Sequence, residues 1–382
     1  MTRTGRSHIK VTTAGLVAAA LTAAGCTSSK PAPTTVTRGS TRPDSATQGL
    51  STGAPSVEPT KGTKAPRKPT SFTINFAGDV HFMDRVGRRL ARNPGTVFGS
   101  AQPGLADADL TMVNLETAIT AGHGTPQNKA FVFRAPPVAL TALRDAGVDV
   151  ATMANNHGAD YGSGGLADTL AAIKQSGFPV IGIGANAKQA FAPYTTTLNG
   201  TKVAIFAADQ VQDETTLSLF SAGPGKPGVA NAFSDRLVRA VKHAKAAGYL
   251  VIVYLHWGIE LDTCPSSLQT GLAATLAGAG ATAVIGTHAH VLQGAGWRPD
   301  GTYVAYGLGN YLWWESFGNN QDDNGVLTLT FRHGRVVRDR FAPSHLDDQG
   351  VPVPSTGAER HRILAEWKQD RSCTDLSAHP PK

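Results

Sequence analysis

From residue 71 onward, short runs of apolar, mostly β-branched residues alternate with longer segments rich in Ala and Leu. The short runs predict buried strands and the longer segments predict helices, so their alternation indicates βα units that build a mainly parallel sheet. Before four of the strands a Gly stands where a helix must end, because a residue tolerant of positive φ is favoured there. The predicted helices span 84–92, 136–146, 165–176, 235–247, 265–279 and 357–371, and the strands preceded by Gly span 148–154, 179–182, 249–255 and 283–285.

Turn dipeptides in the later part of the chain add antiparallel strands, because such pairs favour the tight turns of hairpins. They stand at 199–200 between the runs 194–198 and 202–207, at 300–301 before 302–306, and at 333–334 between 326–332 and 336–341. The whole pattern predicts an α/β domain of layered, mixed β-sheets flanked by helices. This domain covers residues 71–382 and shows no sign of a second core.

The first 25 residues have the pattern of an export signal. Three basic residues precede the apolar stretch 11–24, which is too short to span a bilayer. Ala24-Gly25-Cys26 then resembles a bacterial lipobox, although Ala23 stands where Leu is usual. This predicts a lipoprotein signal peptide over residues 1–25, with Cys26 lipidated and the protein anchored on the extracellular face of the bacterial cell membrane. An ordinary secretory signal with an incidental cysteine is the alternative.

Residues 26–70 are dominated by Thr, Ser, Pro, Gly and Ala, and predict a disordered tether. The formal charge of +7 is concentrated in the first 70 residues, which hold 10 of the 35 Lys and Arg but only 2 of the 28 Asp and Glu. The predicted domain keeps the other 25 basic and 26 acidic residues, a net charge of −1. The domain therefore gives no reason to expect nucleic-acid binding, whereas the basic tether can favour an anionic membrane surface or wall polymer.

Three cysteines in an exported chain leave one thiol without a partner. Lipidation of Cys26 would remove the odd thiol and leave Cys264 and Cys373 to pair in an oxidising compartment. Two free thiols are the alternative, because the distance between these residues cannot be judged from the sequence.

Five apolar runs lead directly into residues that commonly bind metals, and these stretches contain five of the twelve histidines. Because the carboxyl ends of strands in an open α/β sheet face a common crevice, we expect their side chains to converge. Carboxylates and imidazoles without thiolates fit Mn, Fe or Zn and argue against a structural zinc site. The stretches are Gly78-Asp79-Val80-His81, Asn114-Leu115-Glu116, Asn155-Asn156-His157, His256-Trp257-Gly258 and Gly286-Thr287-His288-Ala289-His290.

Six motifs, GDVHF, VNLE, NNHGADYG, LHWG, GTHAH and GLGN, resemble in content and order the poly-gamma-glutamate capsule biosynthesis (CapA) family, whose fold is similar to calcineurin-like metallophosphoesterases. The resemblance covers roughly residues 71–341 and implies two divalent ions. It implies that one ion is bound by Asp79, His81 and His290, the other by Asn156, His256 and His288, and that Glu116 lies between them. It also implies that His157 takes the place of the general acid. Asn310 of the last motif is expected to line the substrate cleft, with a simple turn residue as the alternative.

Two motifs depart from the metallophosphoesterase pattern. The bridging residue there is an Asp in a Gly-Asp pair, whereas here Glu116 follows Asn114-Leu115. The His of the general acid is there followed directly by Asp or Glu, whereas here Gly158 follows His157 and the nearest acid is Asp160. We expect these changes to alter the cavity and the orientation of His157 more than the metal chemistry.

Two functions from different classes fit these observations. The first is a surface-anchored dinuclear metal hydrolase or transferase that acts on an anionic envelope polymer or its precursor, together with capsule synthesis or export proteins. The second is a non-catalytic, metal-dependent polymer-binding or export and assembly factor. Retention of His157, which need not bind metal, favours the enzyme. A solute-binding protein would explain the anchor but not the ligand clusters.

Replacing Cys26 with Ala should release the protein from the membrane fraction, because the lipid at this residue is the predicted anchor. Cell fractionation measures the release, and mass spectrometry of the wild-type N-terminus tests the lipid itself. A wild-type chain cleaved elsewhere, or a variant that stays with the membrane, would contradict the prediction.

Overall fold

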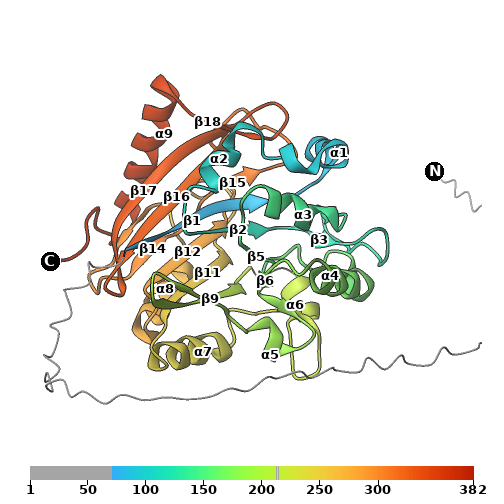
Figure 1. Cartoon of the computed structure of the whole chain (residues 1–382), viewed down its shortest axis with the longest axis horizontal. Coiled ribbons are helices and arrows are strands. Elements are labelled where there is room, and N and C mark those ends of the chain that lie inside the picture. The colour runs from blue at the N-terminus through green and yellow to red at the C-terminus, as the bar shows by residue number, and fades with distance from the viewer. Residues whose placement is uncertain (1–70, 212, 214) are drawn as a thin grey trace, which may run out of the picture. The chain divides into compact units, whose positions relative to one another are not determined.

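The computed structural model describes residues 71–211, 213 and 215–382, and within this range two β-sheets pack face to face with helices on their outer sides (Figure 1). The arrangement confirms the expected fold class of layered, mixed sheets flanked by helices. The predicted signal peptide, the lipidation site Cys26 and the tether lie outside the described residues.

The first sheet has β1 near its centre, with parallel strands on one side and antiparallel strands on the other. β2, β5 and β6 extend it in parallel, β16, β17 and β18 extend it in antiparallel fashion, and the short β15 pairs with the end of β1. The strands are β1 (Phe72–Val80), β2 (Leu110–Leu115), β5 (Val150–Thr152), β6 (Val180–Ile181), β15 (Asn310–Leu312), β16 (Asp323–Arg332), β17 (Arg335–Leu346) and β18 (Pro352–Pro354).

The second sheet has a parallel centre of β9, β11, β12 and β14, with β8 and β13 as antiparallel edges. The predicted hairpins at 199–200 and 333–334 join β8 to β9 and β16 to β17. The strands are β8 (Tyr194–Leu198), β9 (Thr201–Asp209), β11 (Leu250–Trp257), β12 (Ala283–His288), β13 (Ala295–Trp297) and β14 (Tyr303–Ala305); the short pairs β3 (Ala118–Ile119) with β4 (Arg134–Ala135) and β7 (Ile183–Gly184) with β10 (Gly228–Val229) stand apart.

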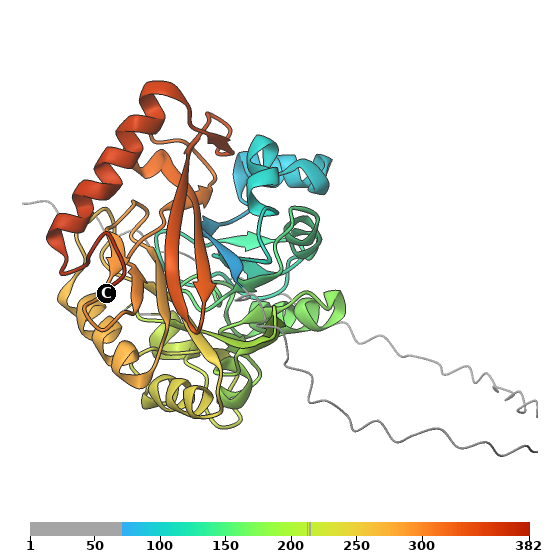
Figure 2. The same ribbon diagram turned by 60° about the vertical axis from the view of Figure 1, so that its left-hand side comes forward.

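Helices cover the outer face of each sheet, and all six predicted helices are confirmed with ends within three residues of expectation. α9 lies beside β17 (Figure 2). Among the described residues, no helix has the length and apolar character needed to cross a membrane. The helices are α1 (Asp84–Arg92), α2 (Gln102–Leu105), α3 (Val138–Asp145), α4 (Gly162–Ser176), α5 (Ala187–Ala190), α6 (Thr216–Phe220), α7 (Asp235–Ala246), α8 (Ser267–Ala279) and α9 (Gly357–Asp370), with short 3-10 turns at Pro94–Thr96, Gly99–Ala101, Asn320–Asp322 and Arg371–Cys373.

The core between the two sheets is built from strand residues that face each other across the interface. Ile74 and Phe76 of β1 belong to the same buried cluster as Ile252 and Tyr254 of β11. Burying such a side chain contributes about 1.5–3 kcal/mol. The Tyr254 hydroxyl also donates a hydrogen bond to the carbonyl of Ala77 at 2.6 Å, which ties the sheets together just before β1 ends.

Gly78 allows β1 to approach the chain leading into β15. A Cβ atom at Gly78 would lie 1.9 Å from the carbonyl oxygen of Gly309, a contact that no side chain can make. The neighbouring N–H of Asp79 donates to that same oxygen at 2.9 Å. The glycine therefore fixes the backbone position from which the Asp79 side chain projects.

A disulfide joins Cys264, in the loop after β11, to Cys373 near the C-terminal end of the chain. The two Cα atoms are 5.6 Å apart, and the bond closes a loop with a sequence separation of 109 residues. It fastens the segment after α9 to the second sheet.

The double variant Cys264→Ser/Cys373→Ser should have a free energy of unfolding lower by about 4–5 kcal/mol, because the cross-link restricts the unfolded chain. Urea unfolding of the oxidised wild type, the reduced wild type and the variant measures this effect. The reduced wild type should match the variant, and Cys26→Ser should match the oxidised wild type. Equal unfolding midpoints for the double variant and the oxidised protein would contradict the prediction.

Candidate metal centre

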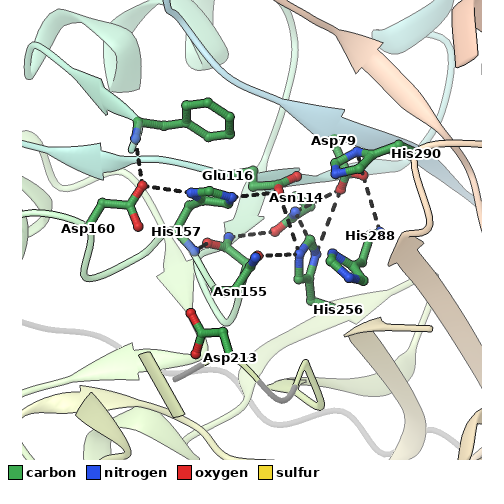
Figure 3. Close-up of polar contacts among 12 residues, drawn as sticks. Asp79, Asn114, Glu116, Asn155, His157, Asp160, Asp213, His256, His288 and His290 are labelled. Carbon is green, nitrogen blue, oxygen red and sulfur yellow. Dashed lines mark hydrogen bonds and ion pairs between the residues drawn. The ribbon is translucent and has the colours of Figure 1, made fainter. Parts of the chain in front are cut away.

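The carboxyl ends of strands from both sheets meet at one edge of the sandwich. Strand register aligns the residues there, since Asp79 pairs with Asn114 and Asn310 in the first sheet and His256 pairs with Thr287 in the second. The polar side chains that project from this edge point toward one another (Figure 3). All five predicted ligand stretches thus contribute side chains to a single buried cluster.

Two overlapping groups of carboxylates and imidazoles lie within this cluster. Glu116, His256 and His288 form one group, and Asp79, Glu116 and His290 form the other. In each group the ligand atoms lie within 4.8 Å of one another. Glu116 belongs to both, which is the arrangement expected of a residue that bridges two ions.

Asparagine side chains hold the cluster in place. Asn114 donates to Asp79 Oδ1 at 2.8 Å, and Asn155 donates to Asn114 Oδ1 at 2.9 Å. Asn156 Oδ1 lies 2.9 Å from His256 Nε2, so the predicted amide ligand faces a predicted imidazole ligand. Asn114 and Asn155 were not among the predicted site residues, because their role is to orient other side chains through contacts between strands.

Asn310 orients His290 and does not line the cleft as expected. Its side chain is fully buried, and its amide nitrogen points toward the carbonyls of His290 and Gln321. Its oxygen lies 2.8 Å from His290 Nδ1 and therefore accepts the proton of that nitrogen. This leaves His290 Nε2 as the nitrogen with a free lone pair.

His81 belongs to neither group, and its expected place on an ion with Asp79 stays a prediction. The prediction assumed an unbroken strand, but β1 ends at Val80 and its register with β15 shifts after Asp79. The His81 ring instead contacts the rings of Phe133 and Trp313, with centroids 4.4 and 4.2 Å away. Its Nε2 accepts a hydrogen bond of 2.9 Å from the backbone N–H of Trp314.

The electrostatics of the cluster fit a divalent cation. Burial raises the pKa of the Asp79 and Glu116 carboxyls and lowers the pKa of the His256 and His288 imidazoles. Among the described residues, no hydrogen-bond partner is found for either carboxylate oxygen of Glu116 or for Nδ1 of His288. Buried groups without partners are costly, and a metal ion would satisfy both the carboxylates and the neutral imidazoles.

Two of the predicted ligands have an unfavourable backbone conformation. His288 has φ of 95° and His290 has φ of 56°, a region that residues with a side chain rarely adopt. Such conformations persist where the surrounding structure enforces them, and they concentrate at functional sites.

His157 faces the cluster from the loop after β5, and a carboxylate orients it. Its Nδ1 lies 2.6 Å from Asp160 Oδ2, and its Nε2 lies 3.7 Å from Glu116 Oε1. Burial lowers the pKa of His157, while Asp160 opposes this effect. Asp160 in turn lies 2.6 Å from Lys129 Nζ, a residue that no sequence motif indicated. Asp160, three residues after His157, therefore orients the His157 ring.

A cleft of about 250 Å³ opens above His157 and His290. Its walls are largely aromatic, and none of the residues that line it is Lys or Arg. The Phe133 ring stacks on the His157 ring with centroids 4.1 Å apart. The aromatic and acidic lining residues are Phe131, Phe133, Trp313, Trp314, Phe317, Glu260 and Glu315.

Residues 73–313 match the family model of the bacterial capsule synthesis protein PGA_cap, and the chain belongs to this family. The family resemblance seen in the six motifs is thereby confirmed. The chain is 28% identical to the capsule biosynthesis protein CapA of Bacillus anthracis over 320 residues. This alignment covers 80% of this chain and 75% of that protein. It is 27% identical to the PGA biosynthesis protein CapA of Bacillus subtilis over 304 residues, and this alignment covers 78% of both chains. A solved phosphatase from Mycoplasma pneumoniae superposes with a TM-score of 0.45 at 18% identity, over 78% of this chain and 98% of that one.

Chelation should lower the stability of the protein and make it more sensitive to pH. A carboxyl whose pKa is raised in the folded state makes the protein less stable as the pH rises above the ordinary pKa of that carboxyl, which is 4.5 for Glu116. Buried imidazoles with a lowered pKa, such as His256 and His288, act in the opposite sense below pH 6.5, so the prediction concerns the difference between two proteins. In chelator, the melting temperature of the wild type relative to Glu116→Gln should fall as the pH rises from about 5 to about 8. Mn²⁺ at a hundred times its Kd should restore about 2.7 kcal/mol per site in the wild type. Identical pH profiles for wild type and variant in chelator would contradict this assignment.

Proposed function

We propose that this protein is a metal-dependent hydrolase or transferase on the outer cell surface, and that it acts on an anionic envelope polymer or its phosphorylated precursor. The single observation that supports catalysis most directly is the orientation of His157. Its imidazole lies beside the candidate metal ligands without belonging to either ligand group, and Asp160 holds its Nδ1. A site that only binds a polymer has no need for this pair.

The residues of the site would have different chemical roles. Two ions bound by Asp79, Glu116, Asn156, His256, His288 and His290 would supply Lewis acidity and neutralise charge on the reacting oxygens. Asp160 stabilises the protonated form of His157, from which Nε2 can donate a proton to a leaving group. The aromatic walls of the cleft limit the access of water and can contact the apolar parts of a substrate.

The charge of the cleft supports a role for the ions in binding as well. Its charged lining residues other than histidine are Glu260 and Glu315, which repel an anionic substrate. An anionic polymer would therefore be attracted by the bound cations rather than by basic side chains. The relatives named above are capsule and PGA biosynthesis proteins, which is consistent with such a polymer. The proposed anchor at Cys26 would hold the site beside the membrane where these polymers are assembled.

His157→Ala should reduce turnover by roughly a hundredfold or more while both ions and the fold are retained, because the side chain donates a proton from outside the ligand groups. Full-length protein loaded with Mn²⁺ can be assayed on a panel of chromogenic phosphoesters, with metal content and melting temperature measured in parallel. His123→Ala is the matched control, because that imidazole is exposed, pairs with Asp168 of α4, and belongs neither to the ligand groups nor to the cleft lining.

Complementation of a strain that lacks the protein decides between the enzyme and the binding factor. The enzyme requires that His157→Ala fails to restore envelope polymer although it keeps its metals. Equal complementation by wild type and variant would support the non-catalytic factor instead. Loss of both ions in the variant would show that His157 is a ligand.

A further inference from the structure

The family pattern assigns His81 to one of the two proposed ions, together with Asp79 and His290. Because the Trp314 N–H donates to His81 Nε2, that nitrogen carries a lone pair, and the single proton of the neutral ring is on Nδ1. In this arrangement neither nitrogen of His81 offers a free lone pair to a metal, and its buried Nδ1 has no hydrogen-bond partner among the described residues.

Glu260 lies where a replacement ligand is needed. Its carboxylate forms a third group with His288 and His290, and the ligand atoms of the three residues lie within 4.8 Å of one another. Glu260 itself is exposed, and among the residues that the structure describes no hydrogen bond or ion pair holds its carboxylate. It lines the cleft directly beside His290.

The loop that carries Glu260 is fixed at several points. Gly258 has φ of 105° and turns the chain sharply after β11. The N–H of Leu261 donates to the carbonyl of Ala289, which lies between the two histidines of the group. Further along, Gln293 Nε2 donates to the carbonyl of Asp262 at 2.7 Å, and Cys264 forms the disulfide. The backbone on both sides of Glu260 is therefore held against the segment that carries His288 and His290.

We infer that Glu260 is a metal ligand of this centre and that it takes the place that the family pattern gives to His81. The inference rests on the proposed dinuclear function. Glu260 would then bind an ion together with His288 and His290, the two imidazoles whose ligand atoms lie within 4.8 Å of its carboxylate.

Metal content of four full-length proteins tests this inference: wild type, Glu260→Gln, His81→Phe and Glu315→Gln. Each is loaded with Mn²⁺, desalted and analysed by plasma mass spectrometry, and Mn²⁺ affinity is measured by calorimetry. Glu315→Gln is the matched control, because it removes a carboxylate from the same cleft that belongs to no ligand group. Melting temperatures in chelator show whether each variant is folded.

Wild type, His81→Phe and Glu315→Gln should each bind two ions. Glu260→Gln should retain one ion, or bind the second at least about tenfold more weakly. Two ions of wild-type affinity in Glu260→Gln, or the loss of an ion from a folded His81→Phe, would overturn the inference and return the role to His81. Failure of the wild type itself to bind Mn²⁺ would reject the dinuclear centre, and with it this inference.

Discussion

Burial of Asp79 and Glu116, with no Lys or Arg paired to either among the described residues, is the constraint on which the site depends. Buried carboxylates need a counter-charge, and the nearest candidates here are imidazoles that burial keeps neutral. The sandwich tolerates this if a bound cation balances the charges or if the carboxyls take up protons, which their raised pKa favours. The close approach at Gly78, the asparagine contacts and the unusual backbone of His288 all hold side chains in an arrangement that a cation would stabilise.

Much of the fold and part of the site could be predicted, because both depend on local pattern. Alternating apolar runs and helix-ending glycines located the helices and strands, and polar residues at strand ends indicated where Glu116, His256 and His288 would converge. The contacts of His81 and Asn310 could not be predicted. Their orientation is decided by partners far along the chain, the Trp314 N–H and the His290 ring, and by a shift in strand register. Contacts between residues so far apart in the chain cannot be inferred from the spacing of residues in the sequence.

The site combines a rigid base with walls from connecting loops. Asp79, Glu116 and His256 come from the ends of buried strands whose positions are set by two sheets packed together. The cleft above them is formed by loop residues such as Phe131 and Trp314. In such an arrangement the metal chemistry can stay constant while loop changes alter the group that enters the cleft, so relatives of this family can share ligands and differ in substrate.

The disulfide has a consequence for when the protein matures. Cys264 ends the loop that carries Glu260, so an oxidised bond to Cys373 limits how far that loop can swing from His288 and His290. If the protein is exported as proposed, the same loop would be held only by its hydrogen bonds until it reaches an oxidising compartment. Oxidation there would then be the step that closes this loop beside the proposed metal ligands.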